Sequence, residues 1–304
     1  MTVLLALLTD LALGDPPNRF HPTAWMGGLI AFLGRFRPHK NSAAEFLFGG
    51  LLMLVGLALA GGIGLGLARL FARLPLPLDW LLTALVLKTT FSLRGLDRAA
   101  GEVQAAIESD NLPEARRLLS WHLVSRDTSQ LSAGQAAAAA IESIAENASD
   151  SLIAPLFFYA LGGLPLALAY RFANTADAML GYHDLEREWF GKIPARLDDV
   201  LNFIPARLTG LLLVCAAFVS GGAGLNAWKI TWRDACLTES PNAGIPMSAM
   251  AGSLSIELEK IGHYRLGAGL NPPQITDLRR ARRVYAITAA LAAIVFSIFA
   301  FLVG

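Results

Sequence analysis

Charged residues are scarce in this sequence. Only 16% of its 304 residues are Asp, Glu, Lys or Arg, whereas about 25% of an ordinary soluble domain is charged. The net charge is +1, and no basic and aromatic repeat occurs, which argues against nucleic acid as a partner. Hydrophobic residues make up 54% of the chain. The composition therefore indicates a protein whose solvent is in large part lipid.

Cysteines and the familiar nucleotide-binding motifs are also sparse or absent. The two cysteines, Cys215 and Cys236, have no spacing suited to a zinc site or a disulfide framework. No Walker A sequence, dinucleotide glycine fingerprint or nucleophile elbow occurs. The apolar stretch 1–13 lacks a basic start and a small-residue cleavage site, so we expect it to be retained rather than removed as a signal peptide.

Long apolar runs predict the fold class. A helix needs about 20 apolar residues to cross a bilayer, because lipid cannot satisfy bare backbone N–H and C=O groups. Four runs reach that length: 46–68, 151–170, 208–228 and 284–304. Two weaker runs, 1–13 and 76–93, are interrupted by Asp10 and by Asp79 and Lys88. We expect an all-α, polytopic membrane protein with four to six membrane segments.

The polar residues fall between these runs, so we expect one integral membrane domain over residues 1–304. Residues 94–150 show apolar residues at helical spacing on both sides of Asp110, Asn111 and Pro113, which predicts a polar helical hairpin. Polar loops are expected at 171–207 and 229–283. The alanine run 136–140 is typical of a tight helix-packing face.

Arginines predict the orientation in the membrane. Arg279, Arg280, Arg282 and Arg283 precede the last run, which places 229–283 in the cytoplasm and the C-terminus outside. Counting back through complete spans puts 171–207 outside and 94–150 inside. Run 151–170 contains Pro155 and a Gly-Gly-Leu-Pro sequence, so it is alternatively a broken or re-entrant helix lining a polar cavity. Run 208–228 would then also need revision, and its glycine-rich tail permits that.

Three carboxylates form the sharpest local pattern. Glu142, Glu146 and Asp150 follow one another at intervals of four residues, which places them on one helical stripe where they repel. Oxygen ligands at this spacing suit Mg²⁺, and ionisable groups near membrane depth are usually functional. A solvated acidic face paired with Arg or Lys is the alternative.

Further polar side chains gather in segments 170–182 and 195–207. Asn174 and Asp177 lie about one turn apart if the first segment is helical. In the second, Arg196 and Arg207 suit bidentate binding of carboxylate or phosphate, with Asp198 and Asp199 beside them. An ordinary juxtamembrane helix with ion pairs explains the second segment equally well. Smaller clusters occur at Asp15 with His21, at 125–128 and at 240–244.

Together these clusters resemble the CobD/CbiB membrane proteins of cobalamin biosynthesis, the adenosylcobinamide-phosphate synthases. The resemblance runs nearly from end to end. It rests on seven motifs in order: Gly14-Asp15-Pro16 with His21-Pro22 and Met26-Gly27; Arg126-Asp127-Thr128; Glu142-Ser143 with Glu146-Asn147 and Asp150; Ala154-Pro155-Leu156-Phe157; Asn174-Thr175-Ala176-Asp177 with Met179 and Gly181-Tyr182; Ala195-Arg196-Leu197-Asp198-Asp199 with Asn202 and Pro205-Ala206-Arg207; and Ser240-Pro241-Asn242-Ala243-Gly244.

The resemblance implies an amide ligase of cobalamin biosynthesis. Such an enzyme joins adenosylcobyric acid, a corrinoid, to (R)-1-amino-2-propanol or its O-phosphate, with ATP and Mg²⁺ activating the carboxylate. It implies a multi-pass protein of the bacterial cytoplasmic (inner) membrane, with an active site that faces the cytoplasm. Other membrane enzymes of late cobalamin assembly and a second copy of the chain are candidate partners.

The resemblance also implies roles for individual residues. The expected metal ligands are Glu142, Glu146 and Asp150. The expected catalytic residues are Glu146, Asp150, Asp177, Asp198, Asp199 and His21, with the last three as candidate bases. The expected substrate-binding residues are Asp15, Arg126, Asp127, Asn147, Asn174, Thr175, Arg196, Asn202, Arg207, Ser240 and Asn242.

The sequence departs from the family pattern in three places. Ser151 stands where a glycine is common, Tyr182 leads into His183 and Asp184, and 259–264 lacks paired glycines. Without the resemblance, a transporter with a carboxylate-lined site would be the first hypothesis. A Mg²⁺-dependent intramembrane transferase and a non-catalytic scaffold are further alternatives.

Overall fold

Helices make up almost the whole structure. The computed structural model describes residues 1–38, 41–181, 188–221 and 223–303. Of the structure, 79% is helical. The strands found in the described part of the chain are β1 (Leu258–Lys260) and β2 (Tyr264–Leu266), which pair antiparallel. The prediction of an all-α fold is confirmed, with this small hairpin added.

Five stretches are long and apolar enough to cross a membrane, which confirms the polytopic architecture. They are Ser42–Phe71, Leu76–Glu108, Ala133–Leu180, Phe203–Ser220 and Ile275–Ala300. The predicted runs 46–68 and 284–304 correspond to the first and last of these. Run 1–13 forms a helix of only 12 residues, which is shorter than the roughly 20 residues that a span needs. The orientation of the spans stays a prediction.

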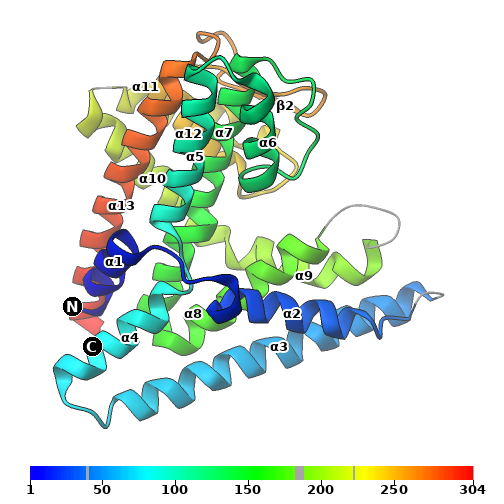
Figure 1. Cartoon of the computed structure of the whole chain (residues 1–304), viewed down its shortest axis with the longest axis vertical. Helices are drawn as coiled ribbons and strands as arrows, with labels where there is room; N and C mark the ends of the chain where they lie inside the picture. The colour runs from blue at the N-terminus through cyan, green and yellow to red at the C-terminus, as the bar shows by residue number, and fades with distance from the viewer. Residues whose placement is uncertain (39–40, 182–187, 222, 304) are drawn as a thin grey trace. The chain divides into compact units, whose positions relative to one another are not determined.

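The chain divides into two compact units, and each is considered by itself. Unit 1 contains α1 (Thr2–Leu13), α2 (Pro22–Gly34), α3 (Ser42–Phe71), α4 (Leu76–Lys88), α8 (Ala154–Leu180), α9 (Glu188–Leu201), the short turn η1 (Asn18–Phe20) and the end of α13 (Figure 1). The expectation of a single membrane domain stays a prediction.

Unit 2 holds the remaining helices and the β-hairpin. It contains α5 (Leu93–Glu108), α6 (Leu112–His122), α7 (Ala133–Ala148), the π-helical turn η2 (Ser149–Ile153), α10 (Phe203–Ser220), α11 (Gly224–Asp234), η3 (Ala235–Leu237), α12 (Gly244–Leu254), β1, β2 and most of α13 (Ile275–Val303). Helices α5 and α6 flank the turn at Asp110 and Asn111.

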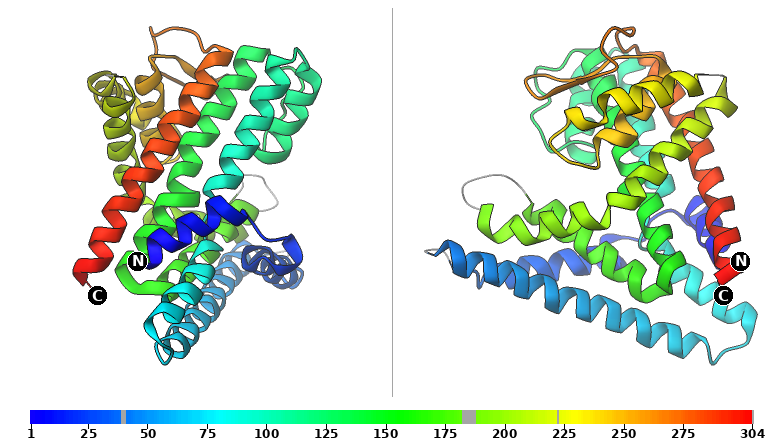
Figure 2. Two further views of the ribbon diagram at one scale, coloured as in Figure 1. Left: turned by 60° about the vertical axis from the view of Figure 1, so that its left-hand side comes forward. Right: turned by 180° about the vertical axis from the view of Figure 1, so that it is seen from behind.

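Helix α8 is broken where the sequence predicts. Gly162 and Gly163 leave helical geometry, with φ/ψ of −157°/27° and 65°/−155°, and Pro165 follows. Only glycine adopts such a positive φ at little cost, and Pro165 has no N–H for a helical hydrogen bond. The green ribbon changes direction at this point (Figure 2). The predicted interruption of run 151–170 is therefore confirmed.

The predicted run 208–228 needs correction. Helix α10 ends at Ser220 and α11 begins at Gly224, so the run is not one helix. Gly221 has a φ of 140°, which is outside the helical region and favours glycine. Helix α10 begins before the predicted run, at Phe203, and is 18 residues long.

Side-chain caps account for the start of two long helices. The Oδ1 atom of Asn41 accepts hydrogen bonds from the backbone N–H groups of Ala43 (2.9 Å) and Ala44 (3.1 Å) at the start of α3. Ser132 and Gln135 form a reciprocal capping box at the start of α7. These bonds satisfy N–H groups that have no partner within the helix.

Glycines bring α3 close to its neighbours in unit 1. Gly49 and Gly64 lie directly against backbone, at Phe190 of α9 and at Leu164–Pro165 of α8, and Gly56 lies against the ring of Phe172. Helices without a hydrophobic driving force between them associate through such close contacts at small residues. The resulting core includes Leu52, Met53, Leu168, Phe172 and Phe190.

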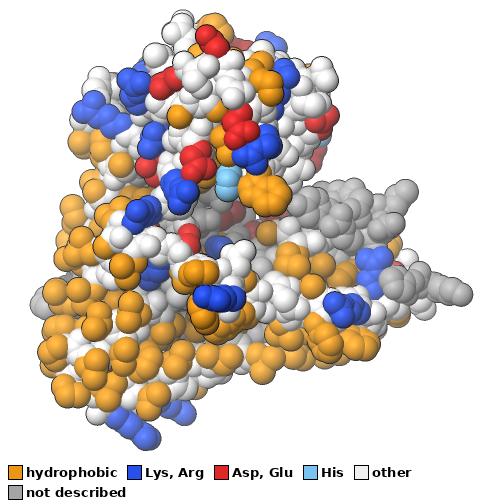
Figure 3. Space-filling model, viewed as in Figure 1, with side chains coloured by type: hydrophobic (Ala, Val, Ile, Leu, Met, Phe, Trp, Pro, Cys, Tyr) orange, Lys and Arg blue, Asp and Glu red, His pale blue; other side chains and the backbone are white. Residues whose placement is uncertain are grey.

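The opposite face of α3 and the surface of α4 are apolar and exposed. Leu47, Leu51 and Leu54 of α3 expose between 53% and 69% of their surface. Hydrophobic side chains accordingly cover the region of these helices in the space-filling view (Figure 3). An apolar surface of this extent suits contact with lipid.

Helix α7 is the centre of unit 2. All residues from Ala136 to Ala145 are buried, and the helix contacts α5, α6 and α12. The alanine run therefore serves as the packing face that the sequence suggests. Arg282 of α13 joins α5 through bonds of 2.8 Å and 2.9 Å to the Asp97 carboxylate.

Substituting the glycines of α3 tests the close packing. A Cβ atom at Gly64 would lie 2.7 Å from both the carbonyl oxygen of Leu164 and Cα of Pro165, whereas a Cβ at Gly66 meets nothing within 4 Å. Because backbone must move, we expect Gly64→Ala to destabilise the protein by about 1–3 kcal/mol. Gly66→Ala should be neutral or stabilising by up to about 1 kcal/mol, since Ala favours helix.

Thermal unfolding of the detergent-purified protein, followed by intrinsic fluorescence, measures both effects. Gly64→Ala and Gly66→Ala form a matched pair, because both replace glycine with alanine in α3. Midpoints that shift equally in the two variants would contradict the close approach at Gly64.

Candidate functional site

A buried lysine organises the N-terminal polar residues of unit 1. Lys88, at the end of α4, is 4% exposed. Its Nζ atom lies 2.5 Å from Oδ1 of Asp15 and 3.3 Å from Oδ1 of Asp10, which is fully buried in α1. The Ser92 hydroxyl donates to Oδ2 of Asp15 at 2.5 Å. Lys88 thus connects α1, α4 and the loop that carries Asp15.

The Asp15 carboxylate stays ionised in this setting. Burial opposes its ionisation, but the hydrogen bonds from His21, Lys88 and Ser92, together with the Lys88 charge, outweigh burial and lower the pKa of Asp15 well below its usual range. Sequence reasoning selected Asp15 and missed Lys88 and Ser92. The charge of Lys88 within an apolar run was the signal that could have identified it.

His21 has a defined orientation beside Asp15. Its Nδ1 atom accepts a hydrogen bond of 3.2 Å from the backbone N–H of Thr23 and caps α2. In the neutral ring the proton is therefore on Nε2, which lies 3.6 Å from Oδ1 of Asp15. Asp15 and His21 are two predicted site residues that the structure brings together.

A second group of polar side chains lies where α8 meets α9. The Asp198 carboxylate accepts hydrogen bonds from Nδ2 of Asn202 at 2.8 Å and from Nδ2 of Asn174 at 3.3 Å. The Tyr170 hydroxyl donates to Oδ1 of Asn202 at 2.8 Å. Burial raises the pKa of Asp198, although the two amides favour its charged form. Three predicted residues, Asn174 of α8, Asp198 of α9 and Asn202 directly after α9, therefore meet at one carboxylate.

Arg171 connects the two groups of unit 1. Its Nη1 atom donates to Oδ1 of Asn174 at 3.3 Å, and its Nε atom lies 3.4 Å from the Thr23 hydroxyl. The Thr23 hydroxyl donates in turn to the carbonyl oxygen of Thr89 at 3.2 Å. Polar contacts therefore run from the His21 loop to Asp198. Sequence reasoning quoted Tyr170 and Arg171 but gave them no role.

Other predicted residues of unit 1 lie at the edge of this network. The Thr175 hydroxyl donates to the Arg171 carbonyl oxygen at 2.7 Å, which is an internal contact of α8. Arg196 is exposed, and its Nη1 atom lies 3.6 Å from Oδ2 of Asp199. The carbonyl oxygen of Asp177 accepts a hydrogen bond of 2.7 Å from the N–H of Gly181. Tyr182, His183 and Asp184 lie outside the described residues.

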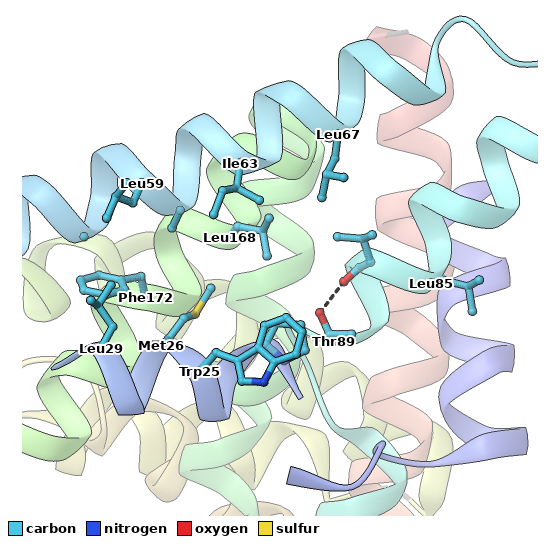
Figure 4. A pocket seen from close by; sticks show the side chains of 14 residues that line it. Trp25, Met26, Leu29, Leu59, Ile63, Leu67, Leu85, Thr89, Leu168 and Phe172 are labelled. Carbon is cyan, nitrogen blue, oxygen red and sulfur yellow. Dashed lines mark hydrogen bonds between the residues drawn. The ribbon is translucent and has the colours of Figure 1, made fainter. Parts of the chain in front are cut away.

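An apolar cavity of about 450 Å³ adjoins this network in unit 1. Trp25 and Met26 of α2, Ile63 of α3 and Phe172 of α8 point into it (Figure 4). Thr89 stands at its margin and donates to the Val86 carbonyl oxygen at 2.7 Å. The cavity offers apolar contact and few polar groups.

The predicted acidic stripe contributes to a charged cavity in unit 2. Glu142 and Glu146 of α7 line this cavity with Arg126, Lys260 and Tyr264. Nη2 of Arg126 lies 3.1 Å from Oε2 of Glu142, whose residue is 5% exposed. Burial and the negative charges of Glu142 and Glu146 raise the pKa of Tyr264 beyond its usual range, so its hydroxyl keeps its proton. Sequence reasoning missed Lys260 and Tyr264, which come from the β1–β2 hairpin.

Asp150 lies where the helix changes its period. Residues Ser149–Ile153 form a π-helical turn, which interrupts the four-residue repeat that the stripe assumes. Asp150 is not among the residues that line the charged cavity. In the described part of the chain, no three His, Cys, Asp or Glu side chains gather closely enough to hold a metal ion. The Mg²⁺ assignment stays a prediction.

The neighbours of the stripe support the local backbone. Asn147 donates through Nδ2 to the Ser143 carbonyl oxygen at 3.0 Å and accepts from the Ser151 hydroxyl at 3.0 Å. Asp127 is exposed and accepts hydrogen bonds from the N–H and hydroxyl of Ser129, which lower its pKa. Ser151, one of the departures from the family pattern, thus has a structural partner in Asn147.

A third cluster joins α10 to the loop before α12. Nη1 of Arg207 lies 3.3 Å from Oδ1 of Asn242 and donates to the Phe203 carbonyl oxygen at 2.7 Å. The Ser240 hydroxyl accepts from the N–H groups of Asn242 (3.2 Å) and Ala243 (3.3 Å). Arg207 and Asn242 are two predicted site residues that lie together, while Ser240 shapes the loop.

Removing the buried cation tests how far unit 1 depends on it. Lys88→Met leaves Asp10 and Asp15 without their cation, and breaking a buried ion pair costs about 3–5 kcal/mol. We expect a large fall in the thermal unfolding midpoint, and a partial recovery when Asp10→Leu is added. Such recovery reveals coupling between the two positions.

Lys229→Met provides the matched control, because Lys229 is exposed on α11. It should leave the midpoint unchanged. Independent, additive effects of Lys88→Met and Asp10→Leu would rule out the proposed coupling.

Comparison with known proteins identifies the family. A family model described as CobD/Cbib protein matches residues 3–294. Cobalamin biosynthesis protein CobD of Dehalococcoides mccartyi is 41% identical over 279 residues, which cover 88% of this chain and 87% of that protein. Probable cobalamin biosynthesis protein CobD of Methanothermobacter thermautotrophicus is 40% identical over 294 residues, with 96% and 95% covered.

Cobalamin biosynthesis protein CbiB of Salmonella typhimurium is 39% identical over 285 residues, which cover 92% of this chain and 89% of that protein. No solved structure gives a significant match. The family model and the relatives extend through both units, so they include all three polar clusters. The chain belongs to the CobD/CbiB family.

Proposed function

We propose that this chain is a membrane amide ligase that joins a carboxylate of adenosylcobyric acid to (R)-1-amino-2-propanol or its O-phosphate. As a member of its family, the protein serves cobalamin biosynthesis. The observation that carries the proposal is the convergence of the family motifs. Side chains far apart in the sequence, such as Asn174 and Asp198, contact one another instead of being dispersed over the surface.

Amide formation requires an activated carboxylate and an uncharged amine. In the proposal, ATP converts the corrinoid carboxylate into a mixed anhydride, and the amine nitrogen then attacks its carbonyl carbon and displaces the phosphate-containing group. The attacking nitrogen must lose protons for the amide to form. A general base that accepts a proton typically contributes about 10²–10⁴-fold to such a rate.

Asp198 is the best-supported base among the three candidates. Its pKa is raised by burial, which makes its carboxylate a stronger base than an ordinary Asp. His21 has Nδ1 engaged by Thr23, and Asp199 is paired with Arg196, with 3.6 Å between Oδ2 and Nη1. Asn174 and Asn202 position the Asp198 oxygens.

Mg²⁺ belongs to the proposal as an ion that enters with ATP. It is usually held by one or two carboxylates together with substrate phosphates, and it neutralises charge that develops on the phosphates. The described residues fit this arrangement better than a resident metal centre, since no three ligands gather. Asp150 belongs to the predicted ligand set but does not line the charged cavity. We propose that Asp150 binds the Mg²⁺ ion that enters with ATP. We place the enzyme in the bacterial cytoplasmic membrane with its site open to cytoplasmic ATP.

Reconstitution tests the reaction directly. The purified protein in lipid, supplied with adenosylcobyric acid, aminopropanol O-phosphate, ATP and Mg²⁺, should yield the amide, identified by its mass. Asp150→Asn should lower turnover by about 10²–10³-fold, as the loss of one charge-stabilising group does. The exposed turn residue Asp110 supplies the control, and Asp110→Asn should retain activity. Absence of product with either amine would refute the proposal.

The pH dependence of turnover tests Asp198. A base must be deprotonated, so activity should fall below a pKa that lies above the ordinary value of 3.8. Asn174→Ala removes a hydrogen bond that favours the carboxylate, which raises this pKa further and moves the acid limb to higher pH. Asp198→Asn should lower turnover by about 10²–10⁴-fold.

The exposed Asn18→Ala variant should keep the wild-type profile. Because the amine titrates equally in all variants, the comparison isolates the enzyme group. An acid limb that stays in place in Asn174→Ala would remove Asp198 from the role of base.

A further inference from the structure

Helix α11 of unit 2 exposes its large apolar side chains instead of burying them. Helical spacing places Leu225, Trp228 and Trp232 on one face, and all three are exposed. The rings of Trp228 and Trp232 contact each other edge to face, with 5.7 Å between their centroids. The opposite face is buried and consists of Gly224, Ala227, Ile230 and Asp234. The polarity of α11 is therefore the reverse of that of a helix on the surface of a water-soluble protein.

Close contacts with α12 and with the loop after β2 hold α11 in this orientation. A Cβ atom at Gly252 of α12 would lie 2.6 Å from Cα of Ala227, so the two backbones touch there. Nδ2 of Asn226 donates to the Gly252 carbonyl oxygen at 3.0 Å. At the end of α11, Oδ2 of Asp234 accepts a hydrogen bond of 2.6 Å from the Gly267 N–H. A rotation of α11 that buried its tryptophans would break these contacts, so the fold itself keeps the apolar face exposed.

The exposed face of α11 continues an apolar surface of α10, which is a candidate membrane span. Phe218 and Val219, near the end of α10, are exposed. Gly224 at the start of α11 lies against the ring of Phe218, since a Cβ atom at Gly224 would come within 2.3 Å of that ring. The two helices also contact each other in unit 2 (Figure 1). Helix α11 therefore begins at the level where α10 leaves the hydrocarbon.

The side chains of α11 suit the boundary between hydrocarbon and water. Trp is enriched at this boundary, because its ring is apolar and its N–H is polar. Lys229 is exposed beside the tryptophans, and a lysine side chain can extend from such a position to headgroup phosphates. Arg233 bonds to Asp234 at 2.6 Å and 2.8 Å. These charges oppose deep insertion, and α11 has 11 residues, fewer than the roughly 20 of a span.

We propose that α11 lies in the lipid–water interface, with Leu225, Trp228 and Trp232 among the upper acyl chains and Lys229 at the phospholipid phosphates. The continuity with α10 favours phospholipid over a second protein chain as the partner of this face, because lipid surrounds the apolar surface of α10. The contact anchors α12 and, through Asp234, the loop after β2 at the membrane surface. The proposal does not depend on the amide ligase reaction.

Nitroxide labels on single cysteines measure the depth of α11. The full-length protein is reconstituted in phosphatidylcholine vesicles, and collisions of each label with oxygen, which concentrates in lipid, are compared with collisions with a water-soluble nickel complex. Trp232→Cys carries the test label, with Cys215 and Cys236 replaced by serine. We expect this label to collide with both reagents, since an interfacial helix lies only about 5–10 Å into the boundary.

Two further exposed positions provide the references for lipid and for water. Cys215, exposed in α10, should collide mainly with oxygen. Trp121→Cys on α6 should collide mainly with nickel, because Ser120 and His122 beside it are exposed and polar. Trp121 is 77% exposed and Trp232 is 74% exposed, so exposure within the chain does not distinguish them. A Trp232→Cys label that behaves like either reference would overturn the proposal. Few collisions with both reagents would mean that protein covers the face and would also overturn it.

Brominated lipids test the tryptophans of α11 without a new label. Bromine quenches the fluorescence of nearby indole rings, and only Trp228 and Trp232 emit when Phe replaces the other four tryptophans, Trp25, Trp80, Trp121 and Trp189. We expect bromine near the headgroups to quench more strongly than bromine at the chain ends. No quenching, or stronger quenching at the chain ends, would contradict the interfacial position. If the fourfold replacement prevents folding, the single-cysteine labels decide the question.

Discussion

The burial of Lys88 between Asp10 and Asp15 is the constraint on which unit 1 depends most. Helix α1 has 12 residues, fewer than the roughly 20 of a complete span, and α4 is the first part of the candidate span Leu76–Glu108. Isolated charges in apolar helices are costly unless they pair. The 2.5 Å and 3.3 Å contacts of Lys88 turn this cost into a link between the two helices and the Asp15 loop. Because His21 follows on that loop, the ion pair also locates the start of α2.

Close packing of α3 against α8 and α9 connects this part of unit 1 to the Asp198 carboxylate. The glycines of α3 admit the ring of Phe172 and the backbone at Phe190, which sets the rotation of α8 and α9 about their axes. Asn174 follows Phe172 by two residues and therefore projects from another side of α8. There its amide reaches Asp198. The apolar face thus determines where the polar face points, and substitutions at α3 act on the site through packing.

The apolar runs and the motifs made much of the helical fold and of the polar clusters predictable. Run length predicts the helical membrane fold, and Gly162, Gly163 and Pro165 predict the break in α8, because these are local properties of chain and solvent. The pairing of Lys88 with Asp10 depends on a contact across 78 positions of sequence, for which one sequence holds no spacing rule. The π-helical turn at Ser149–Ile153 changes the helical period, so a regular four-residue repeat gives the direction of Asp150 only approximately. Lys260 and Tyr264 reach α7 only because a two-stranded hairpin forms within a segment expected to be a polar loop.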